Sequence, residues 1–115
     1  MSSKREPQRL TDIIENIDAI DFYLADMTFE TFLADRKTID ASERCLERII
    51  EATVKIGEDR MQEIAPAIPA RSVRGLGNML RHAYDDIDLT YIFTTIRRDL
   101  PLLRVACVAA LKDLP

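Results

Sequence analysis

The sequence predicts an all-α fold, a bundle of four to six helices in a single domain over residues 1–115. Apolar residues recur at steps of three and four along every long segment, which is the period of a helix face packed on a core. The chain has three glycines and none of the Asn-Gly or Asp-Gly pairs that form tight hairpin turns. Because two domains in 115 residues would each be too small to bury an adequate core, one domain is expected.

Three helices are expected in the N-terminal half. Pro7 suits the first turn of the first helix, and Thr28 can cap a short second one. A longer helix is predicted over about 35–56, with Gly57 as its stop. The first helix presents one apolar stripe, formed by Leu10, Ile13, Ile14, Ile17, Ile20 and Leu24.

The C-terminal half is predicted to contain three more helices. The prolines of "IAPAIPAR" break the chain ahead of a helix over about 71–85. Asp88 is the expected cap of the next helix. Asp99 is the expected cap of the last helix, which has Pro101 in its first turn and runs through Leu111.

Charge and composition restrict the classes of function. The net charge is −4, so the surface as a whole repels a phosphate backbone, and any contact with RNA has to be local. The chain has no Trp and 6% aromatic residues, which argues against an aromatic platform for single-stranded nucleic acid.

The sequence favours a cytoplasmic protein without a membrane segment. No apolar run approaches the roughly 20 residues that cross a bilayer, and the charged N-terminus lacks the apolar stretch of a signal peptide. Cys45 and Cys107 are expected to be free buried thiols in a reducing compartment, with a disulfide as the alternative.

His82 is the one histidine of the chain and the first candidate for chemistry. Asn78 lies one helical turn before it and Arg74 a further turn back, while Asp85 and Asp86 follow where a carboxylate could fix the imidazole tautomer. Such a group could transfer protons, although a lone histidine on a helix is more often packed or solvated. One histidine without a second ligand cannot form a zinc site, so no metal and no cofactor are expected.

The order of four segments resembles the HepT-like members of the HEPN superfamily over about 10–111. These segments are "LTDIIENIDAIDFYL", "FLADRKTIDASERCLERIIEATVKI", "PAIPARSVRGLGNMLRHAYDDID" and "RRDLPLLRVACVAAL". The matching family elements are Glu51-Ala52, the loop from Pro66 to Pro69, Asn78 with His82 and Tyr84, and Asp99 to Pro101.

The resemblance implies a homodimeric helical bundle that cleaves RNA without a metal, with His82 and Asn78 as catalytic residues. It further implies the toxin of a two-gene toxin–antitoxin system. The partner would be a minimal nucleotidyltransferase antitoxin that attaches AMP to the motif tyrosine, Tyr84. The alternative within the same fold is a non-catalytic dimer that binds a protein partner or a nucleotide.

The chain departs from the family pattern at Gly77, where the motif arginine is expected five residues before His82. A phosphate-binding guanidinium would then come from Arg74, Arg81 or the partner subunit. Arg74 lies about 12 Å from His82 along the helix axis, whereas Arg81 adjoins His82 but points about 100° away. Weakened or lost catalysis therefore remains an open alternative.

Overall fold

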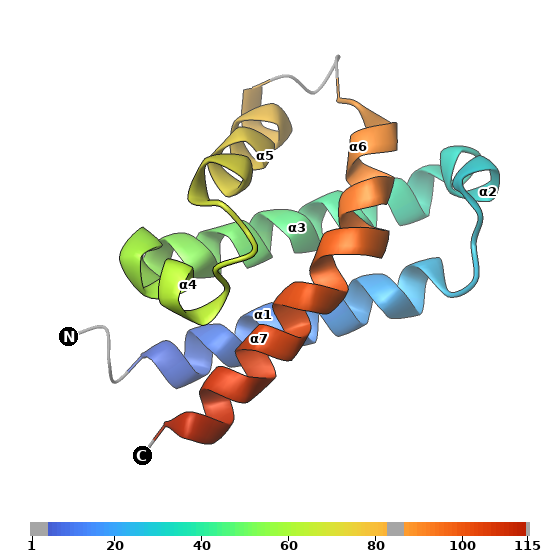
Figure 1. Cartoon of the computed structure of the whole chain (residues 1–115). Coiled ribbons are helices and arrows are strands. Elements are labelled where there is room, and N and C mark those ends of the chain that lie inside the picture. Colours follow the sequence, from blue (N-terminus) through green and yellow to red (C-terminus); the bar gives the residue numbers. More distant parts are fainter. Residues whose placement is uncertain (1–4, 83–86, 115) are drawn as a thin grey trace.

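Three long helical rods build the molecule, and shorter helices pack at their ends (Figure 1). The computed structural model describes residues 5–82 and 87–114. The elements are α1 (Glu6–Leu24), α2 (Phe29–Leu33), α3 (Arg36–Ile56), α4 (Glu58–Ile64), α5 (Ala70–His82), α6 (Leu89–Thr94), the π-helical turn η3 (Thr95–Asp99) and α7 (Leu100–Asp113). Since α6, η3 and α7 follow without a break, the described residues form six helical segments and no strand, which confirms the all-α prediction. None of the described helices is long and apolar enough to cross a membrane.

The core forms where α1 lies against both α3 and α7. Of the predicted stripe on α1, five residues are fully buried and Ile14 is half-buried. Ile49 and Ile50 of α3 and Leu103 of α7 are buried against the same core, as is Leu76 of α5. The helical spacing of apolar residues in the sequence therefore predicted these core positions correctly.

Two of the three predicted caps are confirmed. The Thr28 side chain accepts a hydrogen bond from the backbone N–H of Thr31 in a capping box. The Asp88 carboxylate accepts one from the N–H of Tyr91 at 3.2 Å. Each cap satisfies a backbone donor that the first helical turn leaves without a partner.

The predicted cap at Asp99 was wrong, because its side chain accepts no hydrogen bond from a backbone N–H of α7 and the helical rod runs through Asp99 from η3 into that helix. The Asp99 carboxylate accepts a hydrogen bond from Arg98 Nε at 3.0 Å and caps nothing. The rod continues through η3, in which the N–H of Leu100 donates to the C=O of Thr95, five residues earlier. Pro101 has no N–H and its ring crowds the preceding turn, so a locally wider turn lets the helix pass it.

The short helix α4 was not predicted. Gly57 ends α3 as expected, but its φ of 102°, which favours glycine, turns the chain directly into α4. Arg60 of α4 then binds Glu6 of α1 through two hydrogen bonds, Nε to Oε1 at 2.9 Å and Nη2 to Oε2 at 3.0 Å. These bonds to the largely buried Glu6 raise the pKa of Arg60 above its usual value and fix α4 beside α1.

Both cysteines are buried and free, as predicted. Burial raises the pKa of the Cys107 thiol to about 12 and also raises that of Cys45. Both thiols are therefore packing groups rather than nucleophiles at neutral pH.

Glu6→Ala is expected to lower the free energy of unfolding by about 1–2 kcal/mol, since it removes a bidentate charged hydrogen bond at a mostly buried carboxylate. Asp18→Ala is the matched control. Asp18 also accepts two hydrogen bonds from one arginine, Arg104, but both side chains are well exposed, so solvent screening should make its loss clearly smaller. Urea denaturation followed by circular dichroism measures both, and equal losses would contradict this assignment.

Candidate functional site

The candidate site lies on α5, the helix that carries the sequence motif. Pro69 precedes α5, and the C=O of Pro69 accepts hydrogen bonds from the N–H groups of Ser72 and Val73 in the first turn. Leu76 and Leu80 are buried toward the core, while Asn78 and Arg81 are exposed. Helical periodicity thus places Asn78 and Arg81 on the outer side of α5.

His82 is the last residue of α5, and its side chain lies outside the part of the chain that the structure describes. The same holds for Tyr84, Asp85 and Asp86. The catalytic role predicted for His82, the modification predicted for Tyr84 and the carboxylate support for the imidazole therefore stay predictions. What the structure does place is the backbone position of His82, one residue beyond Arg81.

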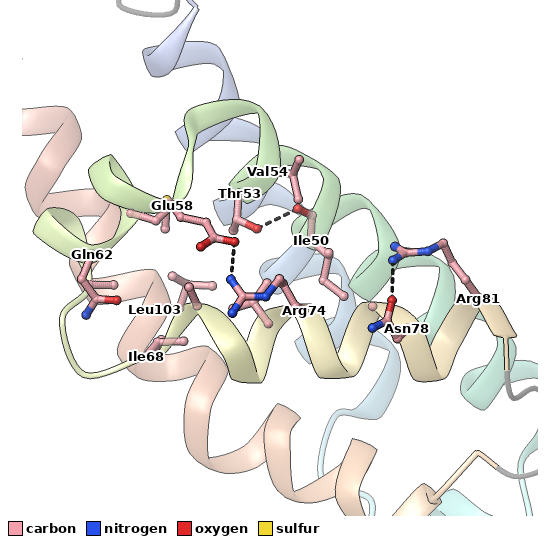
Figure 2. Close-up of a pocket in the computed structure, with 15 residues that line it drawn as sticks. Ile50, Thr53, Val54, Glu58, Gln62, Ile68, Arg74, Asn78, Arg81 and Leu103 are labelled. Atoms are coloured by element: carbon pink, nitrogen blue, oxygen red, sulfur yellow. Dashed lines mark hydrogen bonds and ion pairs between the residues drawn. The ribbon is translucent and has the colours of Figure 1, made fainter.

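The two candidate arginines differ in their partners. Arg74 forms an ion pair with Glu58 at the start of α4, and Figure 2 shows this pair toward the N-terminal end of α5, away from Arg81. Arg81 donates from Nη2 to the neutral side-chain Oδ1 of Asn78 at 3.0 Å. The charge on Arg74 is thus offset by a carboxylate, whereas the interaction of Arg81 is with a neutral amide.

Gly77 makes room for the guanidinium of Arg81. A Cβ atom at residue 77 would lie 3.1 Å from Arg81 Nη1 and 3.3 Å from Ile50 Cγ2. Both distances are tighter than ordinary contacts, so any side chain here would press on Arg81 and on α3. Although Arg81 starts about 100° around the helix from His82, its long side chain folds back to cover the position where the family motif has its arginine.

A hollow of about 180 Å³ opens between α3, α4 and α5 beside this pair. Its lining is mostly apolar and includes Ile50, Val54, Met61, Ile68, Val73 and Leu103. Asn78, Arg81 and the Glu58–Arg74 pair also border it (Figure 2). We call it the apolar hollow.

A second hollow of about 310 Å³ lies on the outer side of α3 and has a charged border. Arg44 pairs with Glu47 at 3.5 Å, and Lys55 Nζ pairs with Glu51 Oε1 at 3.1 Å. The hydrogen bond from Lys55 lowers the pKa of Glu51, which supports a surface ion-pair role for this family-matched residue. The two hollows share Ile50, Val54, Gly77 and Arg81, so we treat them as one groove that passes beneath Arg81.

Two parts of this site were not found from the sequence. The partner of Arg74 is Glu58, which is on the unpredicted helix α4 and sixteen residues away. The apolar hollow was also missed, because it needs the relative placement of α3, α4 and α5. The sequence did contain one indication of α4, at Gly57. A glycine that ends one helix also allows the chain to turn directly into another. Among residues 5–82 and 87–114, no cluster of three or more His, Cys, Asp or Glu side chains could hold a metal ion.

Comparison with known proteins identifies the family. The family model described as "Ribonuclease HepT-like" matches residues 13–110. A protein of Thermococcus cleftensis named "Probable ribonuclease HepT" is 37% identical over 95 residues, which cover 83% of this chain and 86% of that protein. A protein of Methanocaldococcus jannaschii named as a candidate RNase is 32% identical over 105 residues, 91% of this chain and 90% of its own length. No solved structure matches the chain significantly. The chain therefore belongs to the ribonuclease HepT-like family of the HEPN superfamily.

Proposed function

We propose that this protein is a metal-independent endoribonuclease in which Arg81 supplies the guanidinium that the family motif places at residue 77. The single observation that carries the proposal is the position of the Arg81 guanidinium over Gly77, bonded to Asn78 and one residue from His82. Its relatives are named as ribonucleases, and the three motif residues Asn78, His82 and Tyr84 are present in the sequence.

The proposed reaction is internal attack of a ribose 2′-oxygen on the adjacent phosphorus. A base removes the 2′-hydroxyl proton, the bond from phosphorus to the 5′-oxygen breaks, and an acid returns a proton to that oxygen. An imidazole with a pKa near its usual value of about 6.5 can serve either step at neutral pH. The phosphorane carries extra negative charge, which a fixed guanidinium stabilises.

A homodimer would supply both protonation states of the histidine. One chain has a single imidazole, and an in-line displacement puts the attacking and leaving oxygens on opposite sides of the phosphorus, where two imidazoles reach them more directly than one. Two copies of His82 facing one cleft could divide the two roles. We therefore propose that the active form is a dimer, and sedimentation that shows only monomer at micromolar concentration would count against it.

The proposed physiological role is that of a cytoplasmic toxin held inactive by a minimal nucleotidyltransferase antitoxin. Tyr84 is the proposed acceptor of AMP, two residues beyond His82, so a bound AMP would add negative charge where the RNA phosphate has to bind. Such a modification would oppose RNA binding by like-charge repulsion. A gene for a small nucleotidyltransferase beside this one would support the pairing.

A second candidate is a non-catalytic member of the fold that keeps the dimer and the partner. Gly77 favours it, because a glycine at the motif arginine is a direct route to lost catalysis. Under this candidate Arg81 only covers the helix, and the wild type does not cleave RNA unless an arginine is restored at residue 77.

Arg81→Ala is expected to reduce the rate of cleavage of a single-stranded RNA by about 10²–10³-fold, the usual loss on removing one donor to a developing oxyanion. Arg74→Ala is the matched control, because Arg74 is an exposed arginine on the same helix that is paired with Glu58; its rate should fall by less than tenfold or so. Denaturing gels of end-labelled RNA measure both, with His82→Ala as the inactive reference. An active wild type indifferent to Arg81→Ala would show that the phosphate-binding group lies elsewhere.

Substitutions at Gly77 separate the two candidates. Alanine in place of an interior helix glycine usually adds about 1 kcal/mol of stability, but the tight approach to Ile50 Cγ2 should reduce that gain. If Arg81 is the working group, Gly77→Ala pushes it aside and slows cleavage, and Gly77→Arg gives no increase over wild type. A rise in rate with Gly77→Arg would instead show a site disabled by the glycine.

The toxin role predicts growth arrest when the gene is induced alone and rescue when the neighbouring nucleotidyltransferase is induced with it. His82→Ala should abolish the arrest. Mass spectrometry of the co-expressed protein should show a peptide heavier by AMP at Tyr84, and Tyr84→Phe should lack it. Arrest that persists in His82→Ala would contradict a toxin acting through cleavage.

A further inference from the structure

We propose that the apolar hollow is a nucleobase-binding subsite that receives the base of a single-stranded RNA nucleotide flanking the phosphate held by Arg81. The inference rests on the proposed ribonuclease function and adds to it the part of the substrate that the groove recognises. Its basis is the continuity of an apolar hollow with a guanidinium at its rim.

The size and lining of the hollow suit a flat heterocycle. Its volume is about 180 Å³, and an apolar protein cavity of about 150 Å³ already accepts benzene. Ile50, Met61 and Leu103 give it apolar walls. A phosphate or a ribose would lose its hydration there without compensation, whereas a base is the apolar-faced part of a nucleotide.

The rim of the hollow favours RNA over an apolar peptide side chain. Arg81 borders both hollows, so a phosphate at its guanidinium would lie at the mouth of the apolar hollow. Arg44 and Lys55 border the second hollow on the far side of Arg81, but each is paired there with a glutamate, Glu47 and Glu51. The cation that the argument uses is therefore Arg81, whose printed partner is the neutral amide of Asn78. A guanidinium at the mouth and apolar groups inside match a nucleotide, which has an anionic phosphate next to a neutral base.

Two amides beside the hollow can read the edge of a base. Asn78 Oδ1 accepts from Arg81, so its Nδ2 remains the donor on that side. Gln62 Nε2 donates to the C=O of Pro66 at 3.1 Å, so its Oε1 remains an acceptor. A base can enter such a pocket only when it is unstacked, which is why the subsite requires a single-stranded substrate rather than a duplex.

The first test removes the base and keeps the backbone. A short single-stranded RNA is prepared as a set in which each nucleotide in turn is abasic, and cleavage and binding are measured with the wild-type protein. We expect one position next to the scissile phosphate to lose about tenfold or more in kcat/KM and in affinity, because emptying an apolar pocket typically costs at least that much. Equal values at every abasic position would overturn the subsite while leaving the ribonuclease proposal intact.

The second test fills the hollow from its rim with a matched pair of variants. Val54 is 66% exposed and lines the apolar hollow, whereas Val105 is 70% exposed on α7 and lines neither hollow. Val54→Trp is expected to raise the Kd for the unmodified RNA about tenfold or more, and Val105→Trp should bind as the wild type does. Thermal melts show whether either variant is unfolded.

The two proposals fail in different ways. If the wild type binds RNA but does not cleave it, the ribonuclease proposal fails, and the affinities of the abasic set still decide the subsite. If Val54→Trp binds RNA as tightly as wild type, the subsite is wrong even when cleavage is strong. If Val54→Trp and one abasic position both weaken binding by a similar factor, the base occupies this hollow.

Discussion

The close approach of α5 to α3 at Gly77 is the constraint on which the site depends. A Cβ atom there would lie 3.3 Å from Ile50 Cγ2, so the two helices meet at this distance only because residue 77 has no side chain. Because residue 77 has no side chain, the Arg81 side chain can also lie across the helix and donate a hydrogen bond to Asn78. Packing and charge placement are therefore coupled through one residue, and the guanidinium of Arg81, four residues further along the same helix, lies over the position where the resemblance expects an arginine.

Much of the fold could be predicted from the sequence because its helices obey local rules. The stripe on α1, the cap at Thr28 and the cap at Asp88 each depend on residues within one or two turns, which the sequence displays directly. The helix carrying Asn78 followed from the same period. The resemblance added the identity of the motif residues, and the family comparison agrees with it.

The features that could not be predicted depend on contacts between distant segments. The pairs of Glu6 with Arg60 and of Glu58 with Arg74 join helices through side chains 54 and 16 residues apart. The sequence shows such residues only as ordinary surface charges. Likewise, the direction of the Arg81 side chain depends on space at Gly77 and Ile50, which helix geometry alone does not reveal. The failed cap at Asp99 has the same origin, since Asp-Leu-Pro favours a helix start locally and the surrounding rod overrides it.

The π-helical turn η3 also changes how the residues before and after it are aligned around the axis of the C-terminal rod. Ile92 and Leu100 are eight residues apart, and a regular α-helix would place them about 80° apart around its axis. A π turn takes up one extra residue, which reduces that offset to about 20°, and both side chains are in fact buried. The same rod packs against α2 near its start, where Phe93 lies 5.3 Å from Phe32 between ring centroids, and supplies Leu103 to the apolar hollow further along. The extra residue acts as a spacer, which lets a proline-containing rod serve both ends of the bundle without a hinge.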